Sequence, residues 1–168
     1  MPDARTTSPT LLQRAAEPLA GLAIALAAVA LLGLVVVQGW QVIARYVLND
    51  SPSWTEPVTL LLLSTAMSMG AAAGVHTRRH FSFSLVAEAL APRARHAMHV
   101  LQSLVIAVIG LVLLYWGAVL FVDGLHIPTA GAPLPESIEY LPLAASGALM
   151  VVFALAQMAS AGDLPAPV

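Results

Sequence analysis

Four long apolar runs, separated by polar segments, dominate the pattern along the chain. Residues 19–40, 57–75, 100–122 and 140–158 contain no Asp, Glu, Lys, Arg or His. A helix rises about 1.5 Å per residue, so each run is long enough to cross a hydrocarbon core about 30 Å thick. The pattern predicts an all-α integral membrane protein with four transmembrane helices, which form one membrane domain over residues 19–158.

The polar segments predict how these helices are connected. Residues 1–18 carry two Arg and three Pro, and the apolar run behind them is too long for a secretory signal, so we expect a cytoplasmic lead. Residues 159–168 are expected to form a cytoplasmic tail. Residues 84–91 are too few to span a membrane and mix apolar with polar side chains, which predicts a short interfacial amphipathic helix ended by Pro92. Residues 123–139 contain three Pro and no Arg, which predicts a loop with little regular structure.

Composition supports the membrane class and excludes several others. The 168-residue chain is 59% hydrophobic and 10% charged, with a mean hydropathy of +0.85, whereas soluble domains carry about 25% charged residues. The chain has no Cys, which excludes a disulfide framework, a thiolate metal site and a thiol nucleophile. Its seven basic residues are all Arg and cluster beside the apolar runs, which argues against a nucleic-acid-binding surface.

The distribution of Arg predicts the orientation in the membrane. With four spans, both termini and the segment between the second and third spans lie on one side. That side holds six of the seven Arg, and Arg45 is the one Arg on the other side. Cytoplasmic loops are enriched in basic residues, so both termini are expected in the cytoplasm.

A polar corner over residues 41–56 joins the first two runs. Tyr46 and Trp54 have the amphipathic rings that favour the headgroup level. Arg45 and Glu56 fall at the two stems of the corner, where we expect them to pair at low cost. Ser53 and Glu56 have the spacing of a capping box, although the proline that follows leaves the residues just before it as alternative caps for the second helix.

The candidate chemistry is that of a supporting subunit rather than a catalyst. Carriers of protons or charged substrates place ionisable groups at membrane depth, and the four runs contain none. We therefore expect neither an enzyme nor an autonomous ion-coupled transporter, and no cofactor. His76 and His80, and His96 and His99, have spacings that a metal or haem site could use, but no carboxylate or Cys completes a ligand set, which favours interfacial histidines.

Small residues mark candidate helix contacts. Ala66, Gly70 and Gly74 recur every four residues in the second run, and Ala144 and Ala148 have the same spacing in the fourth. Small residues at this spacing let another helix approach closely. Whether that helix belongs to a partner or to this chain's own bundle is left open by the sequence.

Four stretches in order resemble a known family. Arg45, Tyr46 and Asn49, followed by Trp54 and Glu56, are similar to an R-Y-x-x-N…W-x-E signature. Residues 70–80 form a small-residue helix end that leads into His80. Residues 90–95 precede the third run, and a Pro-rich loop leads into residues 140–143. In this order the chain resembles the small permease subunit, DctQ-type, of tripartite ATP-independent periplasmic (TRAP) transporters.

The resemblance implies a function and partners. The chain would be the small membrane subunit of a secondary active transporter, in which a large permease subunit carries sodium and an organic acid, and a periplasmic substrate-binding protein delivers the acid. It would lie in the inner membrane of a bacterial cell, surrounded by membrane lipids, and it would bind no nucleic acid. The structural and interface residues would be Arg45, Tyr46, Asn49, Trp54, Glu56, Gly70, Gly74 and His80.

Two alternatives come from other classes. A small autonomous multidrug or ion transporter, working as an oligomer, would need a carboxylate at membrane depth, and Glu56 is the one candidate near a span. A haem-anchoring subunit of a respiratory enzyme would need His ligands at depth, where the sequence has none.

Overall fold

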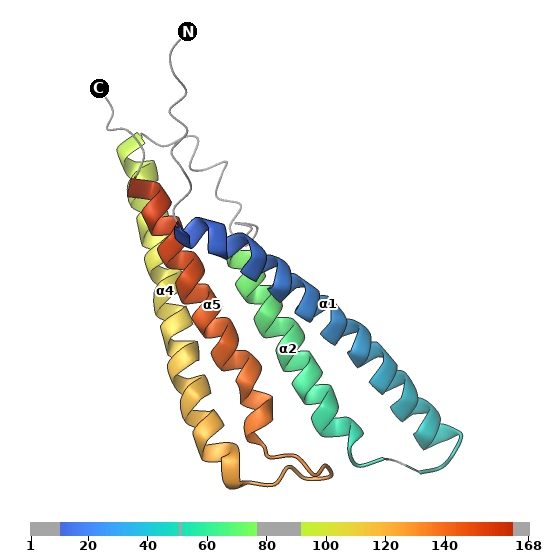
Figure 1. Cartoon of the computed structure of the whole chain (residues 1–168). Coiled ribbons are helices and arrows are strands. Elements are labelled where there is room, and N and C mark those ends of the chain that lie inside the picture. The colour runs from blue at the N-terminus through green and yellow to red at the C-terminus, as the bar shows by residue number, and fades with distance from the viewer. Residues whose placement is uncertain (1–10, 51, 77–91, 163–168) are drawn as a thin grey trace.

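Four long helices make up the computed structural model, which describes residues 11–50, 52–76 and 92–162. They are α1 (Leu11–Tyr46), α2 (Thr55–His76), α4 (Pro92–Asp123) and α5 (Ser137–Gly162), and Figure 1 shows them side by side. Each is long and apolar enough to cross a membrane. The predicted all-α fold with four transmembrane helices is confirmed. The predicted amphipathic helix over residues 84–91 lies outside the described residues, as does His80.

Each helix extends beyond the uncharged run that predicted it. The largest difference is at the start of α1, which begins at Leu11, so residues 11–18 of the expected polar lead are helical. Pro18 lies inside this helix near its first turns, where a proline removes only one helical hydrogen bond. Ala16 is 1% exposed and belongs to the same core cluster as Ala156. From Ala16 onward, this part of α1 therefore packs into a core that it shares with α5.

The helices are arranged in the order α1, α2, α5, α4, with α2 and α5 in the middle and α1 and α4 at the flanks (Figure 1). α1 also contacts α5 beside α2. α1 begins, α2 ends, α4 begins and α5 ends at one end of this bundle. The corner between α1 and α2 and the loop between α4 and α5 lie together at the other end.

The buried and exposed faces of α1 are the reverse of those in a soluble protein. Its buried positions recur in steps of four and three, and they are Ala16, Ala20, Ala23, Ala27 and Ala30. The opposite face carries large aliphatic side chains that are more than half exposed, among them Val29, Leu32, Val35 and Val36. Small residues inside and large ones outside are typical of helices that contact each other in lipid. The step of 3.5 residues on average is that of a left-handed helix pair.

The end of the bundle where α1 begins is closed by aromatic and amide groups. Phe153 of α5 is fully buried, and its ring centroid lies 5.1 Å from that of His76 at the end of α2. Gln157 Nε2 donates a hydrogen bond of 2.8 Å to the Val75 carbonyl. These contacts satisfy one of the carbonyls that a helix end leaves without an internal partner, and they join α2 to α5.

The loop between α4 and α5 is more regular than the sequence predicts. The 3-10 helix η1 (Gly124–His126) continues α4, and an isolated antiparallel bridge joins Pro128 to Pro135. Thr129 N donates to Leu134 O at 2.9 Å, and Glu136 N donates to Ile127 O at 2.9 Å. The expectation of little regular structure is therefore wrong for this loop. Its prolines lie where the bridge does not require their missing N–H groups.

Candidate functional site

The polar corner begins where α1 ends. Asn49 has a φ of +54°, a left-handed conformation that Asn adopts more readily than other non-glycine residues. The backbone turns there, and Asp50 N donates a hydrogen bond of 3.0 Å to Ala44 O, one of the last carbonyls of the helix. A left-handed residue just past a helix is a common way to end it. The structure thus gives a physical role to the Asn of the R-Y-x-x-N pattern.

The two charges at the stems of the corner do not pair. Arg45 and Glu56 are both exposed, and no ion pair joins them in the described part of the chain. The predicted low-cost pairing is therefore absent from this structure. The two residues are close in the sequence, but their side chains are long and flexible and do not come within ion-pair distance of each other.

The two aromatic residues of the corner face outward. Tyr46 is 79% exposed and Trp54 is 42% exposed. Large exposed rings at the end of a membrane helix match the headgroup position expected from the sequence. Tyr46 in particular is accessible to lipid or to a partner protein, whereas more than half of the Trp54 surface is covered by the chain itself.

The start of α2 is held differently from the predicted capping box. No hydrogen bond joins Ser53 to Glu56 in the described residues. Thr55 is fully buried at the first position of α2, and its Oγ1 donates to Pro52 O at 2.8 Å. The Thr55 hydroxyl thus donates to a carbonyl and caps no N–H group, while the Trp54 carbonyl accepts a bond from Val58 N, so neither the capping box nor the alternative cap at Thr55 or Glu56 is found.

Ser53 joins the corner to the other loop at this end. Its Oγ donates a hydrogen bond of 3.1 Å to Gly131 O, across 78 positions of sequence. Gly131 has a φ of +88°, and a Cβ there would lie 2.5 Å from Ser53 O. Only glycine allows this approach without strain. The corner and the α4–α5 loop are therefore joined, and we call them together the loop platform (residues 47–50, 52–54 and 127–136).

The predicted small-residue contacts on α2 are only partly used within the chain. Ala66 is buried, and Gly74 is buried near the helix end. Gly70, in contrast, faces open space, because a Cβ there would meet no atom within 4 Å. His80, the last residue of that pattern, lies outside the described residues.

The closest helix contact involves glycines that the sequence analysis did not single out. Three buried glycines of α4 and its 3-10 continuation recur every seven residues: Gly110, Gly117 and Gly124. A Cβ on Gly117 would lie 2.7 Å from Ala144 N, and one on Gly124 would lie 2.8 Å from Ser137 N. Gly147 of α5 is equally close to α4. The seven-residue spacing in the sequence was the signal that could have identified this contact.

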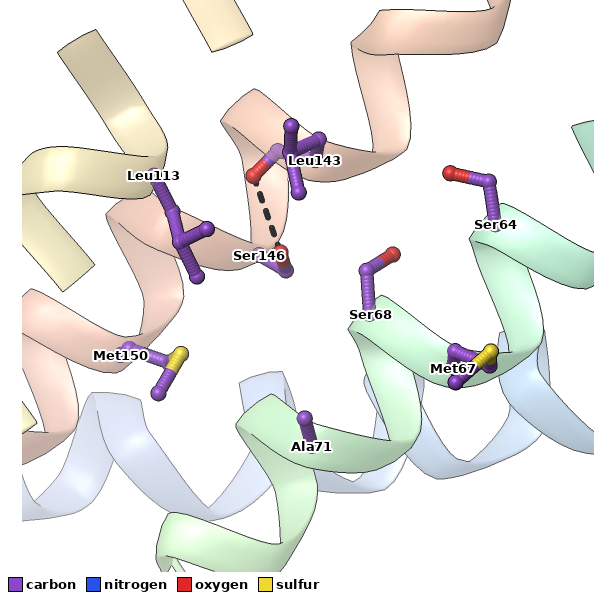
Figure 2. Close-up of a pocket in the computed structure, with 8 residues that line it drawn as sticks. All are labelled: Ser64, Met67, Ser68, Ala71, Leu113, Leu143, Ser146 and Met150. Carbon is purple, nitrogen blue, oxygen red and sulfur yellow. Dashed lines mark hydrogen bonds between the residues drawn. The ribbon is translucent and has the colours of Figure 1, made fainter. Parts of the chain in front are cut away.

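A groove of 290 Å³ opens between α2, α5 and α4 (Figure 2). Its floor and walls combine three serine hydroxyls with methionine, leucine and alanine side chains. α2 provides Ser64, Met67, Ser68 and Ala71; α5 provides Leu143, Ser146 and Met150; and α4 provides Leu113. Figure 2 shows the serines of both helices at the same opening. These hydroxyls are the main polar groups inside the membrane-spanning part of this face.

Metal binding finds no support in the described structure. No group of three or more His, Cys, Asp or Glu residues among the described residues is placed to hold a metal ion. The His76 ring packs against Phe153 instead. His76 therefore has a packing contact in the bundle.

The comparison with protein families decides the assignment. A family model for the DctQ component of tripartite ATP-independent periplasmic transporters matches residues 34–162, more than half of the chain. This chain belongs to the DctQ family. The match includes the last part of α1, the corner, and all of α2, α4 and α5. A comparison with individual curated proteins gives no match.

The assignment confirms the resemblance seen in the sequence. DctQ proteins are small subunits of TRAP transporters, so this chain is a component of a membrane transport system. The family is one of transporter components and not of enzymes. Together with the four helices, it makes the chain a multi-pass inner-membrane protein.

Proposed function

We propose that this DctQ chain supports a large permease subunit in the sodium-coupled uptake of an organic acid, which a periplasmic binding protein delivers. The observation that carries the proposal is the family match over residues 34–162. A tripartite system divides its work among its components. The properties of this chain are those of the component without transport chemistry.

The positions of the charges support this division. The acidic and basic residues described within the helices lie near helix ends, for example Glu56 and Asp123. The uncharged runs offer only hydroxyls and amides, such as those of the groove serines. Binding sodium together with a carboxylate at membrane depth needs groups that this chain lacks there. The coupled transport step is therefore assigned to the large subunit.

We also propose the orientation that the Arg distribution indicates. Both termini would be cytoplasmic, and the loop platform would be periplasmic, where a soluble binding protein could reach it. The exposed Arg45, Tyr46, Trp54 and Glu56 would then face the partners, with Asn49 holding the corner in place. Gly70, Gly74 and His80 would complete the structural and interface positions on the second helix and beyond.

Reconstitution tests the function. Liposomes with this chain alone are expected to show no sodium-driven or proton-driven uptake of organic acids. Uptake should appear when the large permease is present in the membrane and the binding protein is added outside. Robust uptake by the isolated chain would overturn the proposal in favour of the autonomous transporter considered above.

Labelling tests the orientation. The chain has no Cys, so single-cysteine variants report one position each. In intact cells, an impermeant thiol reagent should label Ser53→Cys and should leave Ser84→Cys unlabelled until the cells are opened. The reverse pattern would contradict a periplasmic loop platform.

A further inference from the structure

The end of α1 carries two opposite charges that do not neutralise each other. Asp50 N donates a hydrogen bond of 3.0 Å to the Ala44 carbonyl, so Asp50 lies against the last turn of α1, where Arg45 also lies. Both side chains are exposed, and neither has an ion-pair partner among the described residues. The corner therefore offers a cation and a carboxylate at the same helix end, each free to bind a ligand.

The depth of these charges is that of lipid headgroups. The uncharged run of α1 ends at Trp40, and Arg45 lies five residues farther along the helix. At a rise of 1.5 Å per residue this is about 7 Å beyond the hydrocarbon core. The polar layer on each side of that core is about 5–7 Å thick. The charges of Arg45 and Asp50 are thus placed beside phospholipid headgroups.

Two amides continue the polar surface of α1 toward the hydrocarbon core. Gln41 and Gln38 precede Arg45 by four and seven residues, so all three lie on one face of the helix. Gln38 is exposed and Gln41 is half-buried, and neither amide has a hydrogen-bond partner in the described part of the chain. An amide without a partner is unfavourable in an apolar environment. The ester carbonyls of a phospholipid lie between headgroup and tails and can accept hydrogen bonds from these N–H groups.

The balance of charge at this end of the bundle selects the kind of lipid. Apart from Arg45, the charged side chains in the corner and the α4–α5 loop are the carboxylates of Asp50, Glu56, Asp123, Glu136 and Glu139. Repulsion from these carboxylates disfavours a lipid with a net negative charge. A zwitterionic headgroup instead matches a cation beside a carboxylate. Arg binds phosphate through paired N–H groups, and a primary ammonium has three N–H donors for a carboxylate.

From this arrangement we propose that the end of α1 binds a phospholipid with a primary-ammonium headgroup, of which phosphatidylethanolamine is the example. Arg45 holds the phosphate, and Asp50 accepts hydrogen bonds from the ammonium. Gln41 and Gln38 donate to the ester carbonyls. The inference goes beyond the proposed function, because the site consists of this chain alone and needs no permease.

The end of α4 provides the contrast. Asp123 is exposed there and lies at the same end of the bundle as Asp50 (Figure 1). Residues 97–139 contain no Arg or Lys, so Asp123 has no neighbouring cation for a phosphate. The outer face of α4 below it carries aliphatic side chains such as Val108 and Val112, which suit lipid tails but hold no headgroup. Of the two helices that end here, only α1 combines a cation, a carboxylate and amides.

Lipid selectivity tests the site. The purified chain in detergent is titrated separately with phosphatidylethanolamine, phosphatidylcholine and phosphatidylglycerol of identical acyl chains, and native mass spectrometry measures the bound lipid. Phosphatidylethanolamine should bind about tenfold more tightly than the other two. The trimethylammonium of phosphatidylcholine has no N–H donor, and phosphatidylglycerol has a net negative charge. Equal binding of all three lipids, or tighter binding of phosphatidylglycerol, would overturn the inference.

Variants of the two charges separate the parts of the headgroup. Arg45→Gln should weaken phosphatidylethanolamine binding about tenfold, and Arg45→Lys should retain most of it, because an ammonium also binds phosphate. Asp50→Asn should reduce the preference over phosphatidylcholine to within about twofold and leave phosphatidylcholine binding unchanged. Asp123→Asn is the matched control and should change neither value. Thermal unfolding of each variant without added lipid shows whether it folds. A full preference in Asp50→Asn would refute the headgroup contact.

The amides have a matched control of their own. The pair Gln38→Leu and Gln41→Leu should weaken phosphatidylethanolamine binding about threefold. Gln102→Leu removes a half-buried amide of α4 at the opposite end of the bundle and should have no effect. Equal losses from these changes would contradict a specific role for the α1 amides.

Photo-crosslinking locates the lipid without any substitution. Phosphatidylethanolamine with a diazirine in its headgroup, in nanodiscs that hold the unaltered chain, should label peptides from residues 41–56. Labelling mainly within residues 92–123, or evenly over all four helices, would show that no lipid is held at the end of α1. These measurements use the chain without the permease, so their failure leaves the proposed transport function untouched.

Discussion

The two helical hairpins of this chain are joined in different ways. Between α4 and α5 the backbones themselves approach: a Cβ on Gly147 would lie 2.5 Å from Leu114 N. Between α1 and α2 the contact is made by side chains: a Cβ on Gly33 would lie 3.4 Å from the methyl groups of Leu62, an ordinary van der Waals distance. Lipid tails are as apolar as leucine, so close packing stabilises helix pairs in membranes. The α4–α5 pair has the closer packing.

The loops of the two hairpins also differ in how they are held in place. The α4–α5 loop has three backbone hydrogen bonds within residues 127–136, together with the bridge between Pro128 and Pro135. The α1–α2 corner depends on one left-handed Asn and exposes both of its stem charges. We infer that α4 and α5 form the rigid half of the subunit and that the α1–α2 corner tolerates change, apart from its contact with Gly131.

The largest loss of stability is expected where the backbones of α4 and α5 meet. Gly147→Ala should lower the free energy of unfolding by about 2–3 kcal/mol, because the new methyl group overlaps the backbone of α4. Reversible unfolding of the detergent-solubilised chain measures it. Gly21→Ala is the matched control, since nothing lies within 4 Å of a Cβ there, and its effect should stay within about 1 kcal/mol. Equal losses at both positions would contradict a backbone contact specific to α4 and α5.

A smaller loss of stability is expected where the two loops meet, at Gly131 and Ser53. Gly131→Ala places a side chain at a φ of +88° and against Ser53 O, so it should destabilise the chain by about 1–3 kcal/mol. Hydrogen exchange should increase at the amides of Thr129 and Glu136, which close this loop. Ser53→Ala removes only the hydroxyl bond and should cost about 1 kcal/mol. If the serine variant were the more damaging one, the close backbone approach would not be what holds the platform.

The end of α1 should depend on the conformation of Asn49 rather than on its side chain. Asn49→Ala puts a residue with a Cβ and no local hydrogen bond into the left-handed region, at a cost of about 1–2 kcal/mol. Asn49→Gly fits the same conformation and should retain most of the stability. Unfolding of both variants compares them directly. Equal losses would show that the Asn amide, and not the backbone shape, is needed.

The smallest effect is expected from the charges of the corner. Arg45 and Glu56 are exposed and unpaired with each other, so their coupling in a double-mutant cycle should stay below about 0.5 kcal/mol in the isolated chain. Arg45→Ala, Glu56→Ala and the double variant provide the cycle. A coupling above about 1 kcal/mol, which is the upper limit for an exposed pair, would restore the pairing expected from the sequence.

The hydrophobic pattern predicted the number of helices and their positions, but not their full extents. α1 starts at Leu11, eight residues before the uncharged run, and Ala16 in this extension lies in a core cluster shared with α5. A local average of hydropathy does not contain such a contact. The regular α4–α5 loop was also not predictable. Its hydrogen bonds join residues that come together only after the two helices have paired. The same holds for Ser53 and Gly131, which are 78 positions apart.

The pattern of apolar and charged residues is enough to establish four membrane helices with the charged residues near their ends. This prediction needs only the residues of each segment, because a charge within the hydrocarbon core is unfavourable wherever the other segments lie. The tertiary structure decided which small residues make contacts. Gly70 and Gly117 are both glycines in apolar runs, yet Gly70 faces open space and Gly117 lies against the backbone of Ala144. Which face of a helix turns inward depends on its rotation against its neighbours, and only the packed bundle determines that rotation.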